Sequence, residues 1–339
     1  MRAVGYRTSL AIEHPESLVD IDLPEPVAAG RDLLVEVKAV SVNPVDTKIR
    51  MRAAPEAGSW KVLGWDAAGV VKAAGPDVAQ FRVGDEVFYA GAMQRQGTNA
   101  QYHLVDERLV GRKPSTLDWA QAAALPLTAV TAWEALFDRL DVIKAVPGAA
   151  SAILIIGGAG GVGSIATQLA RQLTSLTVIA SASRPETQDW VREHGAHHVV
   201  DHSRPLAAQV AALGLGAPAF VFSTTNTDAH LAEIVELIAP QGRFAVIDDP
   251  AVLDINPFKR KSVSVHWEFM FTRSMFETPD IGAQGALLNE VSGLVDAGTL
   301  RTTLAEVLGP IDAATLKRAH ALIESGKARG KVVLEGFPG

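Results

Sequence analysis

The chain has 339 residues, of which 48% are hydrophobic and 20% charged, with a formal net charge of −7 and no cysteine. Its length favours two domains, and its composition is that of a globular protein without a disordered signature. The acidic balance offers no general attraction to nucleic acid or to an anionic membrane, and the lack of cysteine excludes disulfides, thiolate metal ligands and cysteine nucleophiles.

Residues 1–110 contain short apolar runs separated by proline and glycine turns. Closely spaced strands without helical periods between them are typical of a β-rich, barrel-like module. The strands are expected at 32–42, 69–75, 84–91 and 100–106, with one short helix at 45–52.

Residues 119–140 have a helical pattern, which Pro126 should divide in two. Strands and helices then alternate as far as residue 247, and the strands are nearly continuously apolar, as in a parallel sheet covered on both faces. The strands are expected at 152–156, 176–181, 197–201, 219–223 and 242–247, and the helices at 160–172, 185–195, 205–213 and 228–239.

The pattern changes again near the end of the chain. A strand is expected at 262–269, helices at 286–298 and 314–326, and a final strand at 330–336. The sequence therefore predicts a parallel α/β core flanked by two segments that together form a second domain.

No run approaches the roughly 20 apolar residues that cross a bilayer, and polar residues interrupt positions 1–18 before any secretory apolar core. We therefore expect a cytoplasmic protein that binds neither membrane nor nucleic acid.

A glycine-rich stretch follows the first strand of the α/β core and opens its first helix. Its spacing Gly158-x-Gly160-x-x-Gly163 is that of a dinucleotide-binding loop. Gly158 is expected to permit the tight turn, Gly160 to let the backbone approach a pyrophosphate, and Gly163 to let the helix pack closely. Ala159, Gly161 and Val162 complete the loop, whose helix amides would face the negative charge. The alternative is a glycine-rich turn that holds no ligand.

The end of the second strand bears on which cofactor is bound. An NAD-preferring site usually places Asp or Glu there, about 20 residues after the glycines. Ser181, Ser183 and Arg184 stand there instead, and Arg can bind a 2′-phosphate by paired hydrogen bonds. This favours NADP(H). In the alternative, Glu186 binds the ribose and Arg184 is a solvated residue at the start of a helix.

These features together resemble medium-chain dehydrogenases/reductases, specifically their zinc-independent quinone oxidoreductase branch, whose members often carry a zinc-type alcohol dehydrogenase-like name. Residues 266–280 are similar to a bacterial subgroup with poorly defined substrates. The likeness occurs in family order at 42–50, 63–71, 83–88, 125–136, 157–170 and 330–336.

The resemblance implies an α/β fold with a doubly wound Rossmann NADP(H)-binding domain at 125–266. A β-rich GroES-like catalytic domain would be made from 1–124 and 267–339. It also implies a homodimer formed through the edge of the Rossmann sheet around residues 242–270.

The sequence departs from the zinc-dependent relatives of this branch. They carry Cys at or next to the position of Asn43 and Gly-His-Glu where this chain has Gly64-Trp65-Asp66, and their structural zinc needs four cysteines. We therefore expect no family-type zinc site. His197, His198 and His202 lie close in sequence, but neighbours on a strand point to opposite faces, and we expect no metal there.

The resemblance also implies residues beside the nicotinamide, namely Asn43 and Asp46. Asn43 would donate from its amide, and its alternative role is that of a turn residue before Pro44. Lys48 stands where several quinone reductases have Tyr, so a tyrosine proton donor cannot be transferred to this chain. Lys48 can donate a proton if burial lowers its pKa, whereas the alternatives are a solvated lysine and proton delivery by water.

Other positions follow from the same resemblance. Thr128, Phe244, Ile247 and Lys331 are expected at the cofactor, although Thr128 can equally cap a helix and Lys331 can be solvated. The aromatic residues expected to line an apolar acceptor pocket, with the protein core as their alternative place, are Trp65, Tyr89, Phe269 and Phe271.

Without a metal ion, hydrogen bonds alone must stabilise the charge that develops on a reduced carbonyl. A quinone or an enone spreads that charge over a conjugated system. The sequence therefore predicts an NADPH-dependent, metal-free reductase of quinones or α,β-unsaturated carbonyls. Its alternatives are a zinc-free alcohol or aldehyde oxidoreductase of the same superfamily and a non-catalytic NADPH-binding protein with a redox-sensing or structural role.

Overall fold

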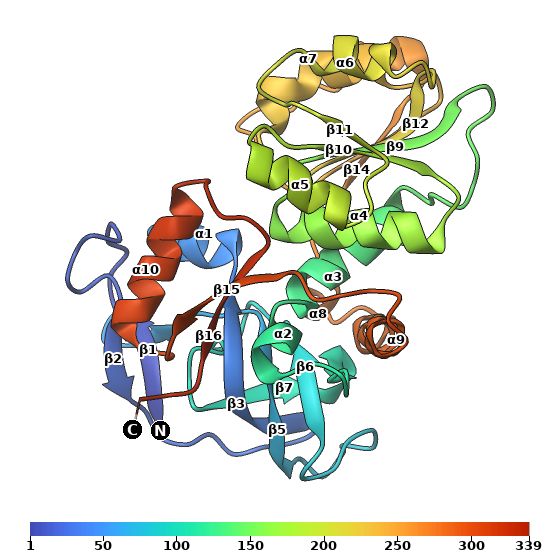
Figure 1. Cartoon of the computed structure of the whole chain (residues 1–339). Helices are drawn as coiled ribbons and strands as arrows, with labels where there is room; N and C mark the ends of the chain where they lie inside the picture. Colours follow the sequence, from blue (N-terminus) through green and yellow to red (C-terminus); the bar gives the residue numbers. More distant parts are fainter. Residues whose placement is uncertain (339) are drawn as a thin grey trace. The chain divides into compact units, whose positions relative to one another are not determined.

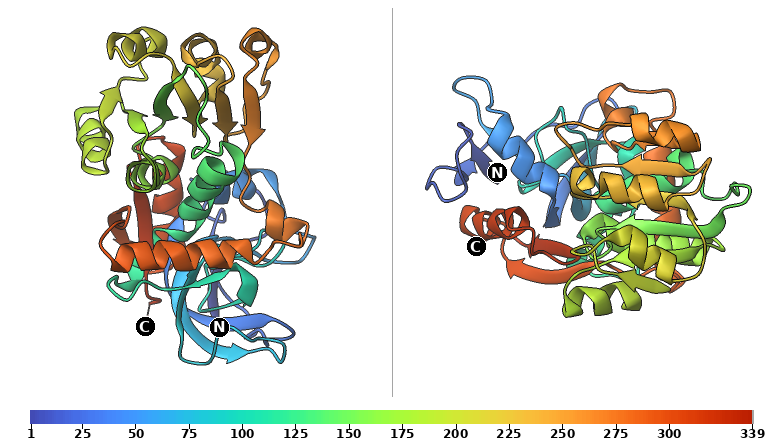
Figure 2. Two further views of the ribbon diagram at one scale, coloured as in Figure 1. Left: turned by 90° about the vertical axis from the view of Figure 1, so that its right-hand side faces the viewer. Right: turned by 90° about the horizontal axis from the view of Figure 1, so that it is seen from above.

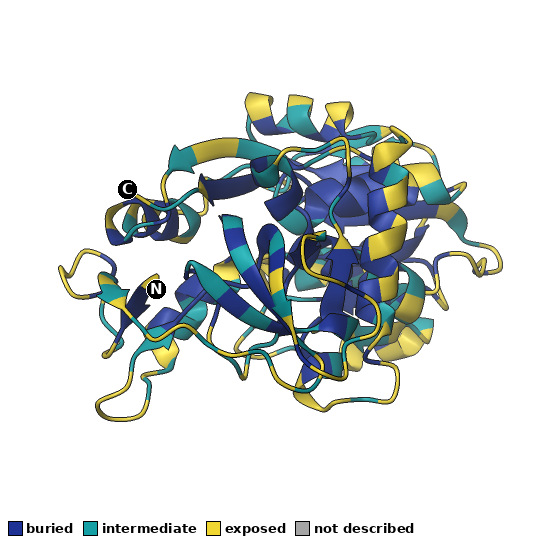
Figure 3. Cartoon of the chain, turned by 90° about the horizontal axis from the view of Figure 1, so that it is seen from below, coloured by how far each residue is buried: buried dark blue, intermediate teal, exposed yellow. Residues whose placement is uncertain are grey.

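The computed structural model describes residues 1–338 (Figure 1). They divide into two units, one made of residues 1–130 and 271–339 and the other of residues 131–270. Both units contain sheets whose central strands are largely buried, whereas many loop residues and the outer turns of helices are exposed (Figure 3).

The first unit is built around β3 (Asp32–Val42), an 11-residue strand whose side chains are mostly buried. β3 pairs antiparallel with β5 (Ala67–Ala74), β7 (Tyr102–Asp106) and β16 (Lys331–Glu335). The seven-stranded sheet also contains β6 (Glu86–Tyr89), β8 (Val110–Arg112) and β15 (Leu304–Gly309), and a three-stranded sheet contains β1 (Arg2–Tyr6), β2 (Val19–Asp22) and β4 (Lys61–Val62).

Both ends of the chain contribute to this unit, as the family resemblance implies. β16 pairs with β3 so that Val332 lies opposite Val42, and Lys331 is therefore brought beside Asn43. The Arg2 side chain donates a hydrogen bond to Pro338 O, so the two chain ends lie side by side (Figures 1 and 2).

Helix α1 (Pro44–Arg52) follows β3 directly and is held from its far end. The buried Arg50 forms an ion pair with Glu324 at the end of α10 (Ala313–Glu324), and Tyr6 Oη donates to Ala53 O at 2.7 Å. The other helices and helical turns of this unit are η1 (Glu107–Leu109), α2 (Trp119–Ala123), α8 (Thr272–Met275) and α9 (Ala283–Asp296).

Pro126 starts a new helix, as predicted. It begins α3 (Pro126–Trp133), which runs across the boundary between the units and continues as a π-helical segment, η2 (Glu134–Arg139).

The second unit contains a six-stranded parallel sheet. Its strands are β9 (Ala150–Ile156), β10 (Thr177–Ser181), β11 (His198–Val200), β12 (Pro218–Ser223), β13 (Arg243–Val246) and β14 (Ser264–Trp267). The order β11-β10-β9-β12-β13-β14 is that of a doubly wound Rossmann sheet, and the strand order reverses direction at β9. β14 forms one edge, the edge where we predict subunit pairing.

Helices cover both faces of this sheet, as its continuous apolar strands require. In Figure 1, α4 (Gly161–Leu173) and α5 (Pro185–Glu193) lie on one side of the strands, and α6 (Leu206–Ala212) and α7 (Thr227–Leu237) on the other. A 3-10 segment, η3 (Asn256–Lys261), precedes β14. Among residues 1–338, no helix is both long and apolar enough to cross a membrane.

Candidate functional site

The glycine loop lies at the carboxyl end of β9, where the strand order of the sheet reverses. Ligands of doubly wound folds bind at this position. The first helical hydrogen bond of α4 is donated by Ser164 N–H to Gly160 O at 2.9 Å. The amide groups of Gly161, Val162 and Gly163 precede it and are available to an anion at the helix start.

Two glycines of the loop are required by its geometry. A Cβ at Gly163 would lie 2.2 Å from Gly157 O and 2.7 Å from Gly158 Cα, so the helix packs against the loop backbone, as predicted. Gly157, which precedes the predicted glycine pattern, has φ at +79°, a left-handed conformation that favours glycine. A Cβ at Gly160 would meet only Gly157 O, at 3.4 Å, which leaves room beside the loop.

The last residue of β10 and the residues that follow it lie next to this loop. Ser181 is fully buried, and its hydroxyl accepts a hydrogen bond from Gly157 N–H at 2.9 Å. It therefore supports the loop from inside. Ser183 and Arg184 are partly exposed, and Arg184 Nε lies 3.0 Å from Glu186 Oε1. Arg184, predicted to bind the 2′-phosphate, and Glu186, the alternative residue for the ribose, thus form one ion pair.

His202 was not predicted to belong to this site. It follows β11, and its Nδ1 lies 3.1 Å from Ser181 Oγ. Because Ser181 pairs with Val200 in parallel strands, the residues that follow β10 and β11 lie together at the carboxyl ends of these strands. The sequence signal was present in the "GAHHVVDH" stretch, but only the strand register shows which of its histidines faces the loop.

A buried polar network lies at the start of α1. Lys331 is 3% exposed, and its Nζ donates to Asp66 Oδ2 at 2.9 Å, to Val42 O at 3.2 Å and to Asn43 Oδ1. Asn43 Nδ2 also donates to Asp66 Oδ2 at 2.9 Å, and Leu127 N–H donates to Asp66 Oδ1 at 2.8 Å. The network therefore uses the Asn43 amide internally, and Lys331 is not a solvated lysine.

Asp46 is buried next to this network. Its Oδ2 accepts a hydrogen bond from Asn43 N–H at 2.6 Å, which forms part of the cap of α1. Burial raises the pKa of Asp46 to about 7, against the N–H groups of Asn43 and Gly64 and the Lys331 ammonium, which lower it. Asp46 can thus gain or lose a proton near neutral pH.

The remaining predicted residues of the first unit are mostly inside it. Thr128 is buried and donates to Leu125 O at 3.1 Å, and Lys48 is half-buried on α1. Trp65 and Phe271 are buried with their rings in an edge arrangement, 6.0 Å between centroids. Tyr89 is fully buried, and its hydroxyl lies 3.1 Å from His103 Nδ1, which places it in the core.

In the second unit, Phe244 is fully buried and packs against Phe258 with 5.5 Å between ring centroids, so it has a core position. Ile247, just after β13, is partly exposed, and Phe269 is about half exposed. Ile247 and Phe269 therefore remain able to touch a ligand, whereas Phe244 contributes packing.

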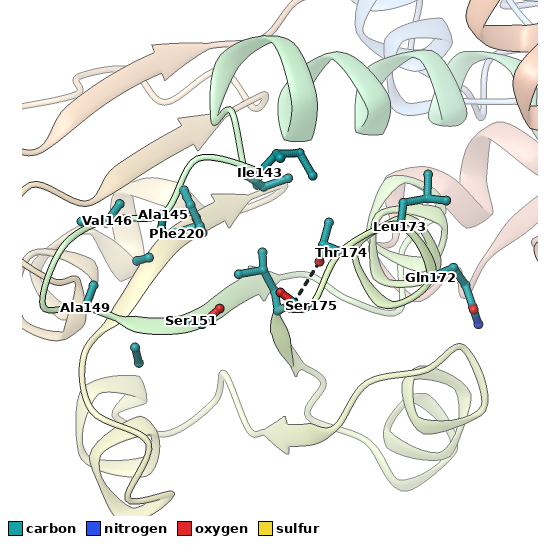
Figure 4. A pocket seen from close by; sticks show the side chains of 14 residues that line it. Ile143, Ala145, Val146, Ala149, Ser151, Gln172, Leu173, Thr174, Ser175 and Phe220 are labelled. Carbon is teal, nitrogen blue, oxygen red and sulfur yellow. Dashed lines mark hydrogen bonds between the residues drawn. The ribbon is translucent and has the colours of Figure 1, made fainter.

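The cavity shown in Figure 4 does not belong to the glycine loop. It has a volume of about 530 Å³ and lies at the start of β9 and β12 and the end of α4. Ile143, Val146, Leu173 and Phe220 form its apolar lining. Because β9 and β12 are parallel, the cavity lies at the amino ends of these strands, whereas the glycine loop lies at their carboxyl ends.

No group of three or more His, Asp or Glu side chains within residues 1–338 is arranged to hold a metal ion.

Two buried glutamates meet where the chain passes between the units. Glu134 opens η2, four residues after one crossing, and Glu268 precedes the other crossing by two residues. Both are almost fully buried, and Arg139 Nε donates to Glu268 Oε2 at 2.8 Å. Burial raises the pKa of Glu268 to about 9, helped by the neighbouring Glu134 and opposed by Arg139.

This pair predicts a pH dependence of stability. Because the folded pKa of Glu268 lies above its ordinary value of 4.5, its proton stabilises the fold fully below pH 4.5, and this stability is lost as pH rises towards about 9. In Glu268→Gln we expect this loss to disappear. The slope of the free energy of unfolding against pH should therefore differ between variant and wild type by up to about 1.4 kcal/mol per pH unit.

The measurement is urea unfolding at pH 5.5, 7 and 8.5. Glu56→Gln, at an exposed position, is the control and should keep the wild-type slope. Equal slopes in Glu268→Gln and the wild type would contradict a protonated Glu268.

Comparisons with known proteins agree with this architecture. The family model described as "Alcohol dehydrogenase GroES-like domain" matches residues 29–115, and the model described as "Zinc-binding dehydrogenase" matches residues 194–334. A zinc-type alcohol dehydrogenase-like protein of Staphylococcus aureus is 38% identical over 339 residues, covering 98% of this chain and 99% of the relative.

Two further proteins are similar over most of the chain. A quinone oxidoreductase of Lama guanicoe is 30% identical over 263 residues, covering 75% of this chain and 77% of the relative. The crystal structure of a putative zinc-dependent alcohol dehydrogenase protein from Rhizobium etli is 70% identical with a TM-score of 0.98, covering 100% of this chain and 98% of that one.

Proposed function

Because this chain belongs to the medium-chain dehydrogenase/reductase superfamily of oxidoreductases, we propose that it reduces quinones or α,β-unsaturated carbonyls with NADPH and without a catalytic metal ion. The observation that carries the proposal is the glycine loop at the point where the Rossmann strand order reverses. Its open side at Gly160 and the amides that start α4 fit a diphosphate.

The cofactor would be held mainly by backbone. The loop from Gly158 to Gly163 would bind the diphosphate, and Ile247 would touch the nicotinamide. When bound, the reduced nicotinamide supplies a hydride. Phe269, which is about half exposed, would contact the apolar acceptor.

The preference for NADPH is supported by charge. Arg184 and Ser183 follow β10, where an NAD site usually has a carboxylate. A dianionic 2′-phosphate would compete with Glu186 for the guanidinium, and the phosphate carries the greater charge.

The Lys331 ammonium supports a metal-free reaction. It lies 2.9 Å from Asp66, the residue that stands where zinc-dependent relatives have Glu, and it already neutralises that carboxylate. A divalent cation placed beside it would be repelled. The resemblance places the zinc-binding Cys of those relatives at or next to Asn43 and their His at Trp65, and neither Asn43 nor Trp65 is a good zinc ligand.

Asp46 is the proposed proton source. After the hydride has been accepted, a reduced quinone or enolate oxygen needs a proton, and a group with a pKa near 7 is suited to supply it at neutral pH. Lys48, half-buried on the same helix, is the second candidate donor. Asn43, whose amide is held by Lys331 and Asp66, would position Asp46 through its backbone N–H.

The test is an acceptor panel of one quinone, one enone and one simple aldehyde, each with NADPH and with NADH. We expect NADPH to be oxidised by the quinone or the enone, with no loss after prolonged treatment with a zinc chelator. Arg184→Gln should weaken NADPH binding about tenfold and leave NADH binding unchanged, since it removes a charge-assisted bond to phosphate.

The other outcomes distinguish the alternatives. Turnover of the aldehyde alone would support the zinc-free alcohol or aldehyde oxidoreductase. Tight NADPH binding without turnover of any acceptor would support a sensing or structural protein. Stoichiometric zinc in the purified protein, with activity lost on its removal, would refute the metal-free proposal.

A further inference from the structure

A closed ring of hydrogen bonds includes the side chain of Asn43. The Lys331 ammonium donates to Asn43 Oδ1 and to Asp66 Oδ2, and Asn43 Nδ2 donates to the same Asp66 oxygen at 2.9 Å. Because an ammonium only donates and a carboxylate only accepts, these contacts fix which end of the Asn43 amide is the oxygen. The third N–H of Lys331 is donated to Val42 O at 3.2 Å. Lys331 therefore has no donor left for a ligand and acts on its neighbours through its charge.

Asp66 is held in this ring as a carboxylate. Its oxygens accept hydrogen bonds from Lys331 Nζ and Asn43 Nδ2 and, at 2.8 Å, from Leu127 N–H. A protonated Asp66 would need an acceptor for its own hydrogen, and none of these three donor groups offers one. Burial raises the pKa of Asp66, and the same three donors lower it. One positive and one negative charge are therefore buried side by side.

The two oxygens of Asp46, beside this ring, have different surroundings. Oδ2 accepts a hydrogen bond at 2.6 Å from the backbone N–H of Asn43, the residue whose side chain the ring holds. Within residues 1–338, Oδ1 has no hydrogen-bond partner, although Asp46 is only 2% exposed. When Asp46 is protonated, we expect its hydrogen on Oδ1, the oxygen that accepts no hydrogen bond. Oδ1 is thus the atom from which a proton can pass to a ligand.

Lys331 and Asp66 act on this carboxyl group with opposite signs. Burial has the largest effect on the pKa of Asp46 and raises it. Asn43 N–H and the Lys331 ammonium lower this pKa, whereas the Asp66 carboxylate raises it. Among residues 1–338, Lys331 on β16 and Asp66 directly before β5 are the charged groups that act on Asp46 from neighbouring elements. Because the two are paired, removing one leaves Asp46 beside the uncompensated charge of the other.

We propose that Lys331 and Asp66 are positioning residues for the proton transfer of the proposed reaction, and that their opposite charges together set how readily Asp46 gives up its proton. The inference rests on the proposed function. After hydride transfer, the enolate or hydroquinone-anion oxygen takes the hydrogen of Asp46 Oδ1, which leaves Asp46 as a carboxylate. Asp46 regains a proton from water before the next turnover. Neither Lys331 nor Asp66 gains or loses a proton in this sequence.

The experiment follows the titration of Asp46 directly and in the reaction. Protein labelled with carbon-13 at its aspartate carboxyl groups is titrated by NMR from pH 5 to pH 9, and the Asp46 signal is identified by its absence in Asp46→Asn. The pH dependence of kcat is measured with NADPH and the acceptor that the wild type reduces. We expect both measurements to follow a pKa of about 7, with kcat falling above it because Asp46 must be protonated to donate.

The variants move this pKa in opposite directions. Lys331→Met should raise the pKa of Asp46 by about one pH unit or more, and Asp66→Asn should lower it by a similar amount, with the fall in kcat moving accordingly. The double variant should lie between them, and Asp66→Asn decides the sign by itself if Lys331→Met does not fold. Lys331→Arg keeps the positive charge and should keep the wild-type pKa. Lys72→Met and Glu36→Gln, from a partly exposed ion pair of the same unit, are the matched controls and should change neither measurement.

Each other result is decisive. Lower kcat or stability in the variants, with the Asp46 titration unmoved, would show a purely structural role and overturn the inference. Shifts of Lys331→Met and Asp66→Asn in the same direction would overturn it as well, and so would opposite NMR shifts with an unmoved kcat profile, since Asp46 would then not be the donor. Opposite NMR shifts in a protein that reduces no acceptor would support the electrostatic role and reject the proposed function itself.

Discussion

Replacing Lys331 by methionine is expected to lower the free energy of unfolding by about 3–5 kcal/mol. The substitution would leave the Asp66 carboxylate, which is 0% exposed, without its ammonium partner. Removing one partner costs more than the net stability that the intact pair contributes, because the remaining buried charge then has neither water nor an opposite charge beside it. Denaturant unfolding of the wild type and variant at pH 7 measures the difference.

Two further variants make this prediction specific. Lys72→Met removes a surface ion pair, Lys72 to Glu36 at 3.3 Å with both side chains partly exposed, and should cost about 1 kcal/mol or less. Adding Asp66→Asn to Lys331→Met removes the orphaned charge and should recover part of the loss. If Lys331→Met lowers the free energy of unfolding no more than Lys72→Met does, the prediction that Lys331 compensates a buried charge on Asp66 is wrong.

Gly163→Ala is expected to reduce both stability and cofactor binding. The added Cβ would stand 2.2 Å from Gly157 O, a backbone atom, so α4 must move away from the loop. Overpacking of this kind costs roughly 1–3 kcal/mol, and the shifted helix amides would no longer meet the diphosphate. We expect NADPH binding to weaken at least about tenfold, which fluorescence titration would measure alongside thermal unfolding.

Gly160→Ala separates the two effects. Its Cβ would meet Gly157 O at 3.4 Å, an ordinary contact, so the unfolding midpoint should stay close to that of the wild type. The methyl group would nevertheless occupy the open side of the loop, and NADPH affinity should fall. Unchanged affinity in Gly160→Ala would place the diphosphate elsewhere.

Much of the fold followed from local patterns. β3 runs from Asp32 to Val42, as predicted, because its apolar and β-branched residues extend between two turn signals. Pro126 divides the helical stretch, and the alternating strands and helices form a parallel sheet. The strands β1, β2, β4, β8 and β15 were not predicted, since each is short or lacks a clear alternation and forms through pairing with strands elsewhere in the chain.

The candidate site, too, was predictable from the sequence only in part. The glycine loop was recognisable because close approach of the backbone requires glycine at fixed spacing, and these glycines are neighbours in the sequence. The left-handed conformation of Gly157 was not predicted, because only the structure shows that this residue is packed against Thr224 and bonded to Ser181.

By itself, then, the sequence determined the two kinds of architecture, the dinucleotide-type loop and the lack of cysteine ligands, since each depends on residue type or on short spacing. Only the tertiary structure decided that Lys331 is buried against Asn43 and Asp66, and that His202 touches Ser181. Lys331 and Asn43 are 288 residues apart, and the antiparallel register of β16 with β3 brings them together. Strand pairing between distant segments leaves no local signal in the chain, and it sets which buried charges find a partner.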